Sequence, residues 1–423
     1  MTGSHSSSPV DAPDEPVAFN PFEPGYHDDP YAQYARLREH DPVHHSVLGP
    51  WFLFRHDDVE RLIRDPELSV EFANARMEDT PRLNMFEAVL GEELTAQVRE
   101  RGDHAILNLD PPAHTRLRRL MAKVFTPKAV EDLRPRAQAI VEEHLDRVTP
   151  SGAMDVIGDL AFPLPVQVIS EMLGMPEADR DRLREWSHVL AGTLDPVLPP
   201  EHIRAAFDAS ILMGEYVRDV TATKRAEPAD DLLSALIHAE DEGDVLSEDE
   251  VLDNVILLYI AGHETTVNLI GNGTLALLTH REQYERLVAD PSLGPSAVEE
   301  CLRFDSPVQF TRRITLVPIT IDGHAIDEGA FVLACLGSAN HDAHFWGPTA
   351  DDFDIGRDDA RKQLSFGGGF HHCLGAALAR LEGQVALSAL AQRFPRLALD
   401  GAPERNGRIV LRGLDALPVT LGL

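Results

Sequence analysis

The chain has 423 residues, and 70 acidic against 38 basic residues give it a formal net charge of −32. This charge repels polyanions, so the composition argues against a protein that binds nucleic acid. Hydrophobic residues make up 43% of the chain, which is enough for a sizeable core and excludes disorder for most of its length.

The first 20 residues are rich in Ser, Pro and acidic residues. They lack the basic start and apolar run of a signal peptide, so we expect a disordered tail over residues 1–20. No run of 18 apolar residues follows, and we expect no membrane anchor. The three cysteines, Cys301, Cys335 and Cys373, are too few for a disulfide framework and suit a reducing compartment. A cytoplasmic protein is therefore expected.

Helical periodicity dominates the remaining chain, and strand patterns are short. A helix is expected over Tyr31–Glu39, followed by a hairpin of Val43–Val47 and Trp51–Phe54. Residues 69–104 have mixed polarity and weak periodicity, which predicts a mobile loop region.

Two later helices begin at favourable starts, Asp110-Pro111-Pro112 and Thr126-Pro127, because Asp and Thr can cap a helix and proline is tolerated in its first turn. The second helix is expected to run to about Val148. The remaining pattern predicts helices over 166–173, 177–191, 201–225, 230–240, 295–304 and 374–394, strands over 314–321 and 331–336, and an irregular stretch over 341–363.

The longest predicted helix begins at a capping box, Ser247-Glu248-Asp249-Glu250, and continues without proline to about Thr279. Its roughly 32 residues correspond to a length of about 48 Å. The centre, residues 255–260, is apolar on all sides, which indicates a helix that passes through the core.

A glycine-rich loop, FGGGFHHCLG, spans Phe366 to Gly375. Its three glycines allow the backbone to approach a flat, bulky group closely. Cys373 is predicted at the start of a helix, where backbone N–H groups stabilise a thiolate and lower its pKa. The residues alone allow a metal-bound thiolate, a buried structural cysteine or a zinc ligand together with His371 and His372. Zinc is disfavoured because adjacent ligands do not easily reach one tetrahedral ion.

The loop resembles the haem-binding signature of the cytochrome P-450 family, F-x-x-G-x-H-x-C-x-G, at all five fixed positions. The chance of such a match in a chain of this size is about one in ten thousand. The resemblance extends from about residue 20 to the end and implies the cytochrome P-450 fold, mainly α with a small β-rich part, as a single catalytic domain over 21–423. It implies haem b as cofactor and Cys373 as the iron ligand, with haem contacts from Phe366, Gly367, His371 and Gly375.

A second motif, Ala261-Gly262-His263-Glu264-Thr265-Thr266, lies midway along the longest predicted helix. Taken alone, it suits a polar contact between helices. The resemblance places it on the oxygen side of the haem, with Ala261, Gly262 and Thr265 against the cofactor and Gly262 leaving room over the ring. It implies that Glu264 relays protons and Thr265 hydrogen-bonds bound dioxygen, because O–O cleavage needs two protons. This pair argues for a monooxygenase and against a haem carrier without turnover.

The third motif is Glu300-Cys301-Leu302-Arg303. Glu and Arg at this spacing can form an ordinary surface pair worth a few tenths of a kcal/mol. The resemblance instead implies a buried structural pair that Arg357 joins, holding the side of the molecule that carries the cysteine loop.

His114 and Arg118 share one helix face, which on its own suits a solvated surface. The resemblance implies that both bind the haem propionates, together with Arg313 and His371. Arg312 is the rival of Arg313, because alternation along a strand lets only one of them face the haem.

The resemblance also implies the reaction and its partners. One oxygen atom of O2 enters an apolar or amphipathic small molecule, by hydroxylation or epoxidation, and electrons come from NAD(P)H through ferredoxin and ferredoxin reductase. An acidic ferredoxin is expected to dock over Arg116, Arg119 and Lys123, with Arg118 turned toward the haem. A carrier-bound substrate remains an alternative, and we expect a monomer. The residues expected to contact substrate are Ile260, Ala261, Val308, Phe310 and Leu411.

Overall fold

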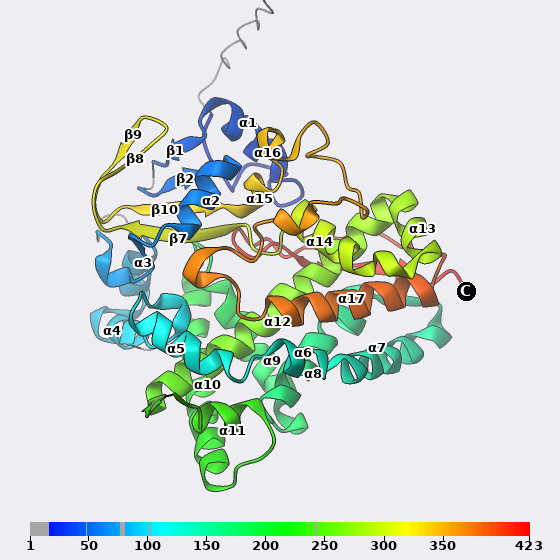
Figure 1. The fold of residues 1–423 in the computed structure, drawn as a ribbon, viewed down its shortest axis with the longest axis horizontal. Helices are drawn as coiled ribbons and strands as arrows, with labels where there is room; N and C mark the ends of the chain where they lie inside the picture. The colour runs from blue at the N-terminus through cyan, green and yellow to red at the C-terminus, as the bar shows by residue number, and fades with distance from the viewer. Residues whose placement is uncertain (1–16, 48, 77–80, 101–102, 242) are drawn as a thin grey trace, which may run out of the picture.

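The computed structural model describes residues 17–47, 49–76, 81–100, 103–241 and 243–423. The predicted disordered tail, residues 1–20, therefore lies almost wholly outside the described part. Helices make up most of the molecule, and a small sheet lies at one edge together with α1, α2, α15 and α16 (Figure 1). The predicted fold class, mainly α with a small β-rich part, is confirmed.

The helices of the described residues follow in chain order. They are α1 (Tyr31–His40), α2 (His56–Arg64), α3 (Pro81–Leu90), α4 (Glu92–Glu100), α5 (Ala113–Ala122), α6 (Pro127–Glu131), α7 (Arg134–Val148), α8 (Pro163–Met172), α9 (Arg180–Gly192), α10 (Pro200–Ala226), α11 (Leu232–Ile237), α12 (Glu248–Thr279), α13 (Arg281–Ala289), α14 (Gly294–Phe304), α15 (Leu336–Ala339), α16 (Ala343–Trp346) and α17 (Ala376–Arg393).

The largest sheet within these residues has the order β1-β2-β10-β7-β3. Its strands are β1 (Val43–His45), β2 (Trp51–Leu53), β3 (Leu68–Ser69), β7 (Phe310–Thr315) and β10 (Phe331–Cys335). β10 pairs in parallel with β2 and antiparallel with β7, where Val332 lies opposite Arg313. The shorter strands pair as β4 (Ala153–Asp155) with β14 (Pro418–Thr420), β14 with β11 (Ala398–Leu399), β5 (Glu240–Asp241) with β6 (Asp244–Val245), β8 (Ile319–Ile321) with β9 (His324–Ile326), and β12 (Glu404–Arg405) with β13 (Leu414–Ala416).

The long helix α12 packs in the centre of the molecule, as the sequence predicts, but of the apolar residues 255–260 only Val255 and Tyr259 are buried. Its capping box is formed: the Ser247 hydroxyl accepts from the Glu250 N–H at 3.2 Å, and the Glu250 carboxylate accepts from the Ser247 N–H at 2.8 Å. α12 packs against α8, α9, α10, α14 and α17. Most of its second half is buried, because neighbouring helices and β13 of the C-terminal segment pack around it.

Residues 69–104 do not form a loop region, because α3 and α4 occupy most of that segment. α3 packs on α10, where Phe86 joins Leu198 and Ile203 in a small apolar cluster. Among the side chains described in these two helices, Phe86 and Thr95 are the buried ones. A helix that buries so few positions shows little periodicity, which explains why the pattern was weak.

Two other predicted elements are split by proline. The helix expected from Thr126 to Val148 is interrupted at Leu133, and α7 begins with Pro135 in its first turn. The strand expected over 314–321 ends at Thr315 and resumes at Ile319, directly after Pro318. Proline has no backbone N–H to donate to a helix or to a neighbouring strand. The predicted helix and the predicted strand are therefore each interrupted next to a proline.

Candidate active site

The cysteine loop packs against the end of α2. A Cβ at Gly369, whose φ is +63°, would lie 2.8 Å from the Ile63 carbonyl oxygen. The loop is closed by a 2.9 Å hydrogen bond from the Cys373 N–H to the Phe366 carbonyl oxygen. Close approach to α2 and a left-handed backbone therefore account for Gly369, whereas the sequence attributed the glycines to a flat ligand.

Cys373 lies before the last long helix, not at its first residue, since α17 begins at Ala376. Burial raises the pKa of the Cys373 thiol, and N–H groups of Gly375 and Ala376 together with Arg118 and Arg380 only partly oppose it. The expected lowering of the pKa by the helix start is therefore wrong for the free thiol, because burial outweighs it. A half-buried thiol beside these N–H groups and cations still suits a thiolate once a metal cation supplies the missing positive charge.

Positively charged and imidazole groups gather beside this loop. The rings of His114 and His371 lie 4.4 Å apart, and both ring nitrogens of the buried His114 have no hydrogen-bond partner among the described residues. Arg118 donates to the His372 carbonyl oxygen at 2.7 Å. Burial, together with the nearby positive charges of His114, Arg313 and Arg118, lowers the pKa of His371 to about 3. These side chains fit a ligand with anionic groups such as the two haem propionates.

The strand β7 separates its two arginines. Arg313 is 4% exposed and donates to the Ile63 carbonyl oxygen at 2.8 Å, on the side of His371. Arg312 lies over the Phe72 ring at 4.0 Å and donates to Asn108 at 2.9 Å. The strand therefore directs the two guanidinium groups to different surroundings, as alternation predicts.

The motif on α12 presents two different faces. Ala261 is exposed in the middle of this central helix, and the half-buried Thr265 donates to the Ala261 carbonyl oxygen at 3.0 Å. A Cβ at Gly262 would lie 3.3 Å from Ile169 of α8. Close packing against α8 therefore also favours glycine at this position.

Glu264, on the other face of α12, is held by two residues from distant elements. Its carboxylate accepts from His188 of α9 at 3.1 Å and from Arg408 at 3.0 Å. Burial raises the pKa of Glu264, but hydrogen bonds from His188 and His263 and the charge of Arg408 outweigh it, so the pKa lies well below its usual range. Sequence reasoning missed His188 and Arg408, since neither lies in a motif and only the fold brings them to Glu264.

A cleft of about 680 Å³ opens onto this carboxylate. Its lining includes His188, Glu264 and Asn268. The side-chain nitrogen of Asn268 is buried without a hydrogen-bond partner among the described residues. Buried polar groups of this kind are commonly satisfied by ordered water. The arrangement can therefore bring solvent protons to Glu264.

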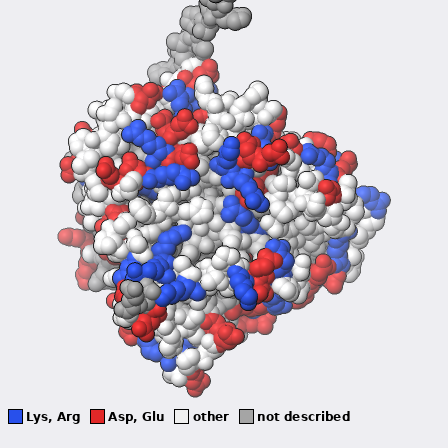
Figure 2. Space-filling view, viewed as in Figure 1, with Lys and Arg blue, Asp and Glu red and all other residues white. Residues whose placement is uncertain are grey.

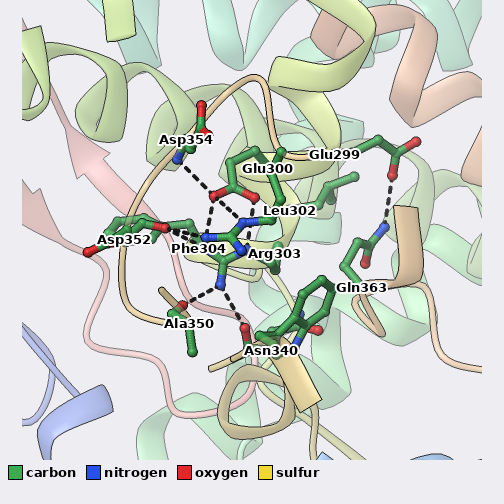
Figure 3. A network of polar contacts seen from close by, with 12 residues as sticks. Glu299, Glu300, Leu302, Arg303, Phe304, Asn340, Ala350, Asp352, Asp354 and Gln363 are labelled. Atoms are coloured by element: carbon green, nitrogen blue, oxygen red, sulfur yellow. Dashed lines mark hydrogen bonds and ion pairs between the residues drawn. The ribbon is translucent and has the colours of Figure 1, made fainter. Parts of the chain in front are cut away.

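The Glu300–Arg303 pair is fully buried (Figure 3). Arg303 donates to both oxygens of Glu300 at 2.8 Å and to the carbonyl oxygens of Asn340, Ala350 and Asp352 at 2.6–2.8 Å. Arg357 reaches the same carboxylate at 3.3 Å. A surface pair is excluded, and the network ties α14 to the irregular segment before the cysteine loop.

The residues expected to contact substrate fall into two groups. Ile260 and Val308 are half-buried, Ala261 is exposed, and Leu411 is buried and forms an isolated β-bridge with Val308. Phe310 instead belongs to an aromatic cluster with Tyr34 and Phe52, and its ring lies 5.4 Å from that of Phe19. We therefore remove Phe310 from the substrate contacts, because its strand face packs against the N-terminal segment.

The expected docking surface on α5 is partly neutralised. Arg116 is paired with Glu250 and with Asp244, and Lys123 donates to the Glu240 carbonyl oxygen at 2.8 Å. Arg116 is therefore withdrawn as a docking cation. Lys and Arg side chains nevertheless surround the centre of the face on which the cysteine loop lies (Figure 2). Phe370 of that loop is 45% exposed.

The cysteine loop, the cationic cluster and the α12 motif together fit a flat, anionic metal cofactor. The sequence model of the family described as Cytochrome P450 matches residues 84–290 and 293–406. Cytochrome P450 107B1 of Saccharopolyspora erythraea is 41% identical over 416 residues, 95% of this chain and 97% of that protein. The vitamin D(3) 25-hydroxylase of Pseudonocardia autotrophica is 42% identical over 413 residues, 95% of this chain and 96% of that protein.

The solved structure of the cytochrome P450 PksS of the Bacillus subtilis bacillaene polyketide synthase has a TM-score of 0.85 at 35% identity, covering 96% of this chain and 100% of that chain. The chain therefore belongs to the cytochrome P-450 family of haem-thiolate monooxygenases. Among the described helices, none is both long and apolar enough to cross a lipid bilayer.

Proposed function

We propose that residues 21–423 form one haem b monooxygenase domain with Cys373 as the iron ligand. The observation that carries this assignment is the buried, unpartnered imidazole of His114 among Arg118, Arg313 and His371, beside the cysteine loop. Such a set of donors binds two carboxylates, and haem b has two propionates. The loop residues Phe366, Gly367 and Gly375 frame the thiolate.

When bound, the haem supplies an iron centre that activates O2 for insertion into a C–H or C=C bond. Cys373 would hold the iron as a thiolate and would supply electron density to it. Thr265 carries its hydroxyl on the face of α12 marked by the exposed Ala261, whose carbonyl oxygen accepts the hydroxyl proton in this structure. With haem bound, rotation of the hydroxyl away from that carbonyl would offer the proton to the reacting side. Glu264 takes protons from water in the cleft, and release of its carboxylate from Arg408 frees it to pass them on.

The substrate proposed is an apolar or amphipathic small molecule that contacts Ile260, Ala261, Val308 and Leu411. Three of these side chains are aliphatic and partly or fully buried, which favours apolar surface on the ligand. The relative named vitamin D(3) 25-hydroxylase supports the same class of substrate.

Electrons are proposed to come from NAD(P)H through a reductase and a small acidic ferredoxin. The ferredoxin docks on the face of the cysteine loop, whose Phe370 is exposed, as are Arg119 and Lys123 of α5, Arg64 of α2 and Lys362. Arg64 and Lys362 are paired with Glu60 and Asp359, but their side chains keep 56% and 63% of their surface exposed, against 30% for Arg116. Opposite charges steer the encounter, and a central aromatic residue supplies apolar contact. Reversing charge at Arg64 and Lys123 should slow reduction at low salt, and the difference should shrink as salt rises.

The reduced carbon monoxide spectrum of the purified protein tests the assignment. A thiolate-ligated iron gives a strongly red-shifted Soret band, and substrate screening then follows the spectral change when a ligand displaces water from the iron. A protein that binds no haem, or whose carbonyl complex lacks the shifted band, would refute the proposal.

A further inference from the structure

Arg380 of α17 lies against the cysteine loop. Its guanidinium carbon is 4.4 Å from the centre of the Phe366 ring, a stacked cation–aromatic contact. Phe366 is also the residue whose carbonyl oxygen accepts the Cys373 N–H at 2.9 Å. The guanidinium group therefore covers the ring of the residue whose carbonyl oxygen closes the loop of the proposed iron ligand.

Glu299 of α14 fixes Arg380 in this position. Its two oxygens accept from Arg380 at 2.6 and 3.2 Å, which is a bidentate pair. Glu299 is 4% exposed and also accepts from Gln363 at 3.2 Å (Figure 3). The Arg380 side chain keeps 29% of its surface exposed, yet the Glu299 carboxylate and the Phe366 ring both hold its guanidinium group in place. This pair is separate from the Glu300–Arg303 pair on the same helix.

The contacts place the charge of Arg380 beside the cysteine loop. Its guanidinium group stacks on the ring of Phe366, the residue whose carbonyl oxygen accepts the Cys373 N–H. Arg118 belongs to the proposed propionate cluster, whereas Arg380 has no role in the reaction described above. The negative charge of Glu299 cancels part of the field of Arg380.

We propose that Arg380 is a positioning residue that raises the reduction potential of the Cys373-ligated iron, and that Glu299 limits how much of its charge the iron senses. Reduction adds an electron, so a fixed positive charge nearby stabilises the reduced state more than the oxidised one. The inference rests on the proposed function, since it requires haem iron at Cys373.

The two partners of the pair give opposite predictions. Arg380→Gln removes the positive charge and should shift the midpoint potential of the holoenzyme to more negative values. Glu299→Gln removes the compensating negative charge and should shift it to more positive values. Arg380→Lys keeps the charge and should stay close to the wild-type potential. A loss of local packing alone does not produce opposite signs in two partners of one ion pair.

Arg393→Gln is the matched control. Arg393 lies on the same helix and is also paired with carboxylates, Glu142 at 2.8 Å and Asp146. It is 13 residues beyond Arg380, about 20 Å along the helix. The midpoint potential of this variant should equal that of the wild type.

The measurement is a spectroelectrochemical titration of each holoenzyme, preceded by its reduced carbon monoxide spectrum. Absence of the thiolate band in the wild-type protein refutes the proposed function and not the charge effect. With the band present, equal potentials in Arg380→Gln and Arg380→Lys overturn the inference, as do shifts of the same sign in Arg380→Gln and Glu299→Gln. If Glu299→Gln does not fold, the Gln and Lys variants of Arg380 still decide the question.

Discussion

The substitution Glu300→Ala is expected to destabilise the folded protein strongly. Arg303 is completely buried and would keep its three carbonyl acceptors but lose its counter-charge. Arg357 would lose the same partner, and the N–H of Asp354, which donates to Glu300 at 3.0 Å, would lose its acceptor. Breaking a buried pair by removing one member costs about 3–5 kcal/mol.

That cost translates into a measurable melting shift. An unfolding entropy of about 2.1 cal/mol/K per residue gives roughly 0.9 kcal/mol/K for a chain of this length, so we expect Tm to fall by about 3–6 °C. Thermal and urea unfolding followed by circular dichroism, with haem content measured in parallel, provide the assay. The loss is a large part of a typical stability of about 5–15 kcal/mol.

Two further variants separate charge from volume. Glu300→Gln keeps the size of the side chain but places an amide N–H₂ against the donors of Arg303, so it should also destabilise the protein. Glu142→Ala breaks a pair whose carboxylate is 60% exposed, and it should change stability by no more than about 0.5 kcal/mol. The reasoning is refuted if Glu300→Ala unfolds within about 1 kcal/mol of the wild type, or if Glu300→Gln is indistinguishable from it.

Three other predictions concern the site itself. Cys373→His should retain some haem but lose the red-shifted carbonyl Soret band; a band that persisted would make Cys301 or Cys335 the ligand. Thr265→Ala should keep haem and substrate binding while NAD(P)H consumption yields hydrogen peroxide in place of product, and unchanged coupling would remove the role of Thr265. His371 has a folded-state pKa of about 3, below its ordinary 6.5, so it stabilises the fold above pH 6.5 and that stability is lost as pH falls toward 3. Its contribution to the apoprotein should drop by about 2 kcal/mol between pH 7 and pH 5, and His371→Gln should flatten the pH dependence of urea unfolding; parallel curves would contradict it.

Local signals in the sequence predicted those parts of the fold that depend on local chemistry. The capping box at Ser247 and the apolar centre of α12 located the central helix to within a residue at each end. The hairpin of β1 and β2 followed from alternation around a Gly-Pro turn. α3 was missed because it packs against α10 through few buried side chains, which leaves no apolar stripe in the sequence, and α4 packs on α3.

In the candidate site, too, residues in local motifs could be found from the sequence, whereas residues brought in by tertiary packing could not. Cys373, Glu264, Thr265 and Glu300 could be selected as candidates because each lies in a short motif with fixed spacing, and the structure confirms that the Glu300 pair is buried. Arg408 and Arg380 could not, since each acts on a partner that only the tertiary fold brings near it. Phe310 was misplaced for the complementary reason: the side to which a strand residue points depends on which layers cover the sheet, and here the N-terminal segment covers it.

The contacts of Glu264 bear on how the reaction can be timed. A carboxylate 5% exposed in a central helix is tolerated because His188 and Arg408 hold it ionised, and these partners belong to α9 and to the C-terminal segment. An ionised carboxylate that is bound to His188 and Arg408 carries no proton and is not free to turn toward Thr265. A relay through Glu264 therefore requires these two contacts to loosen. Asp195, just beyond α9, accepts from the N–H groups of Ile409 and Val410 at 2.8–3.2 Å and ties the same two segments together. A movement of α9 relative to the C-terminal segment would therefore change the contacts of Glu264 directly, and under the proposed function it would link the position of that helix to the delivery of protons.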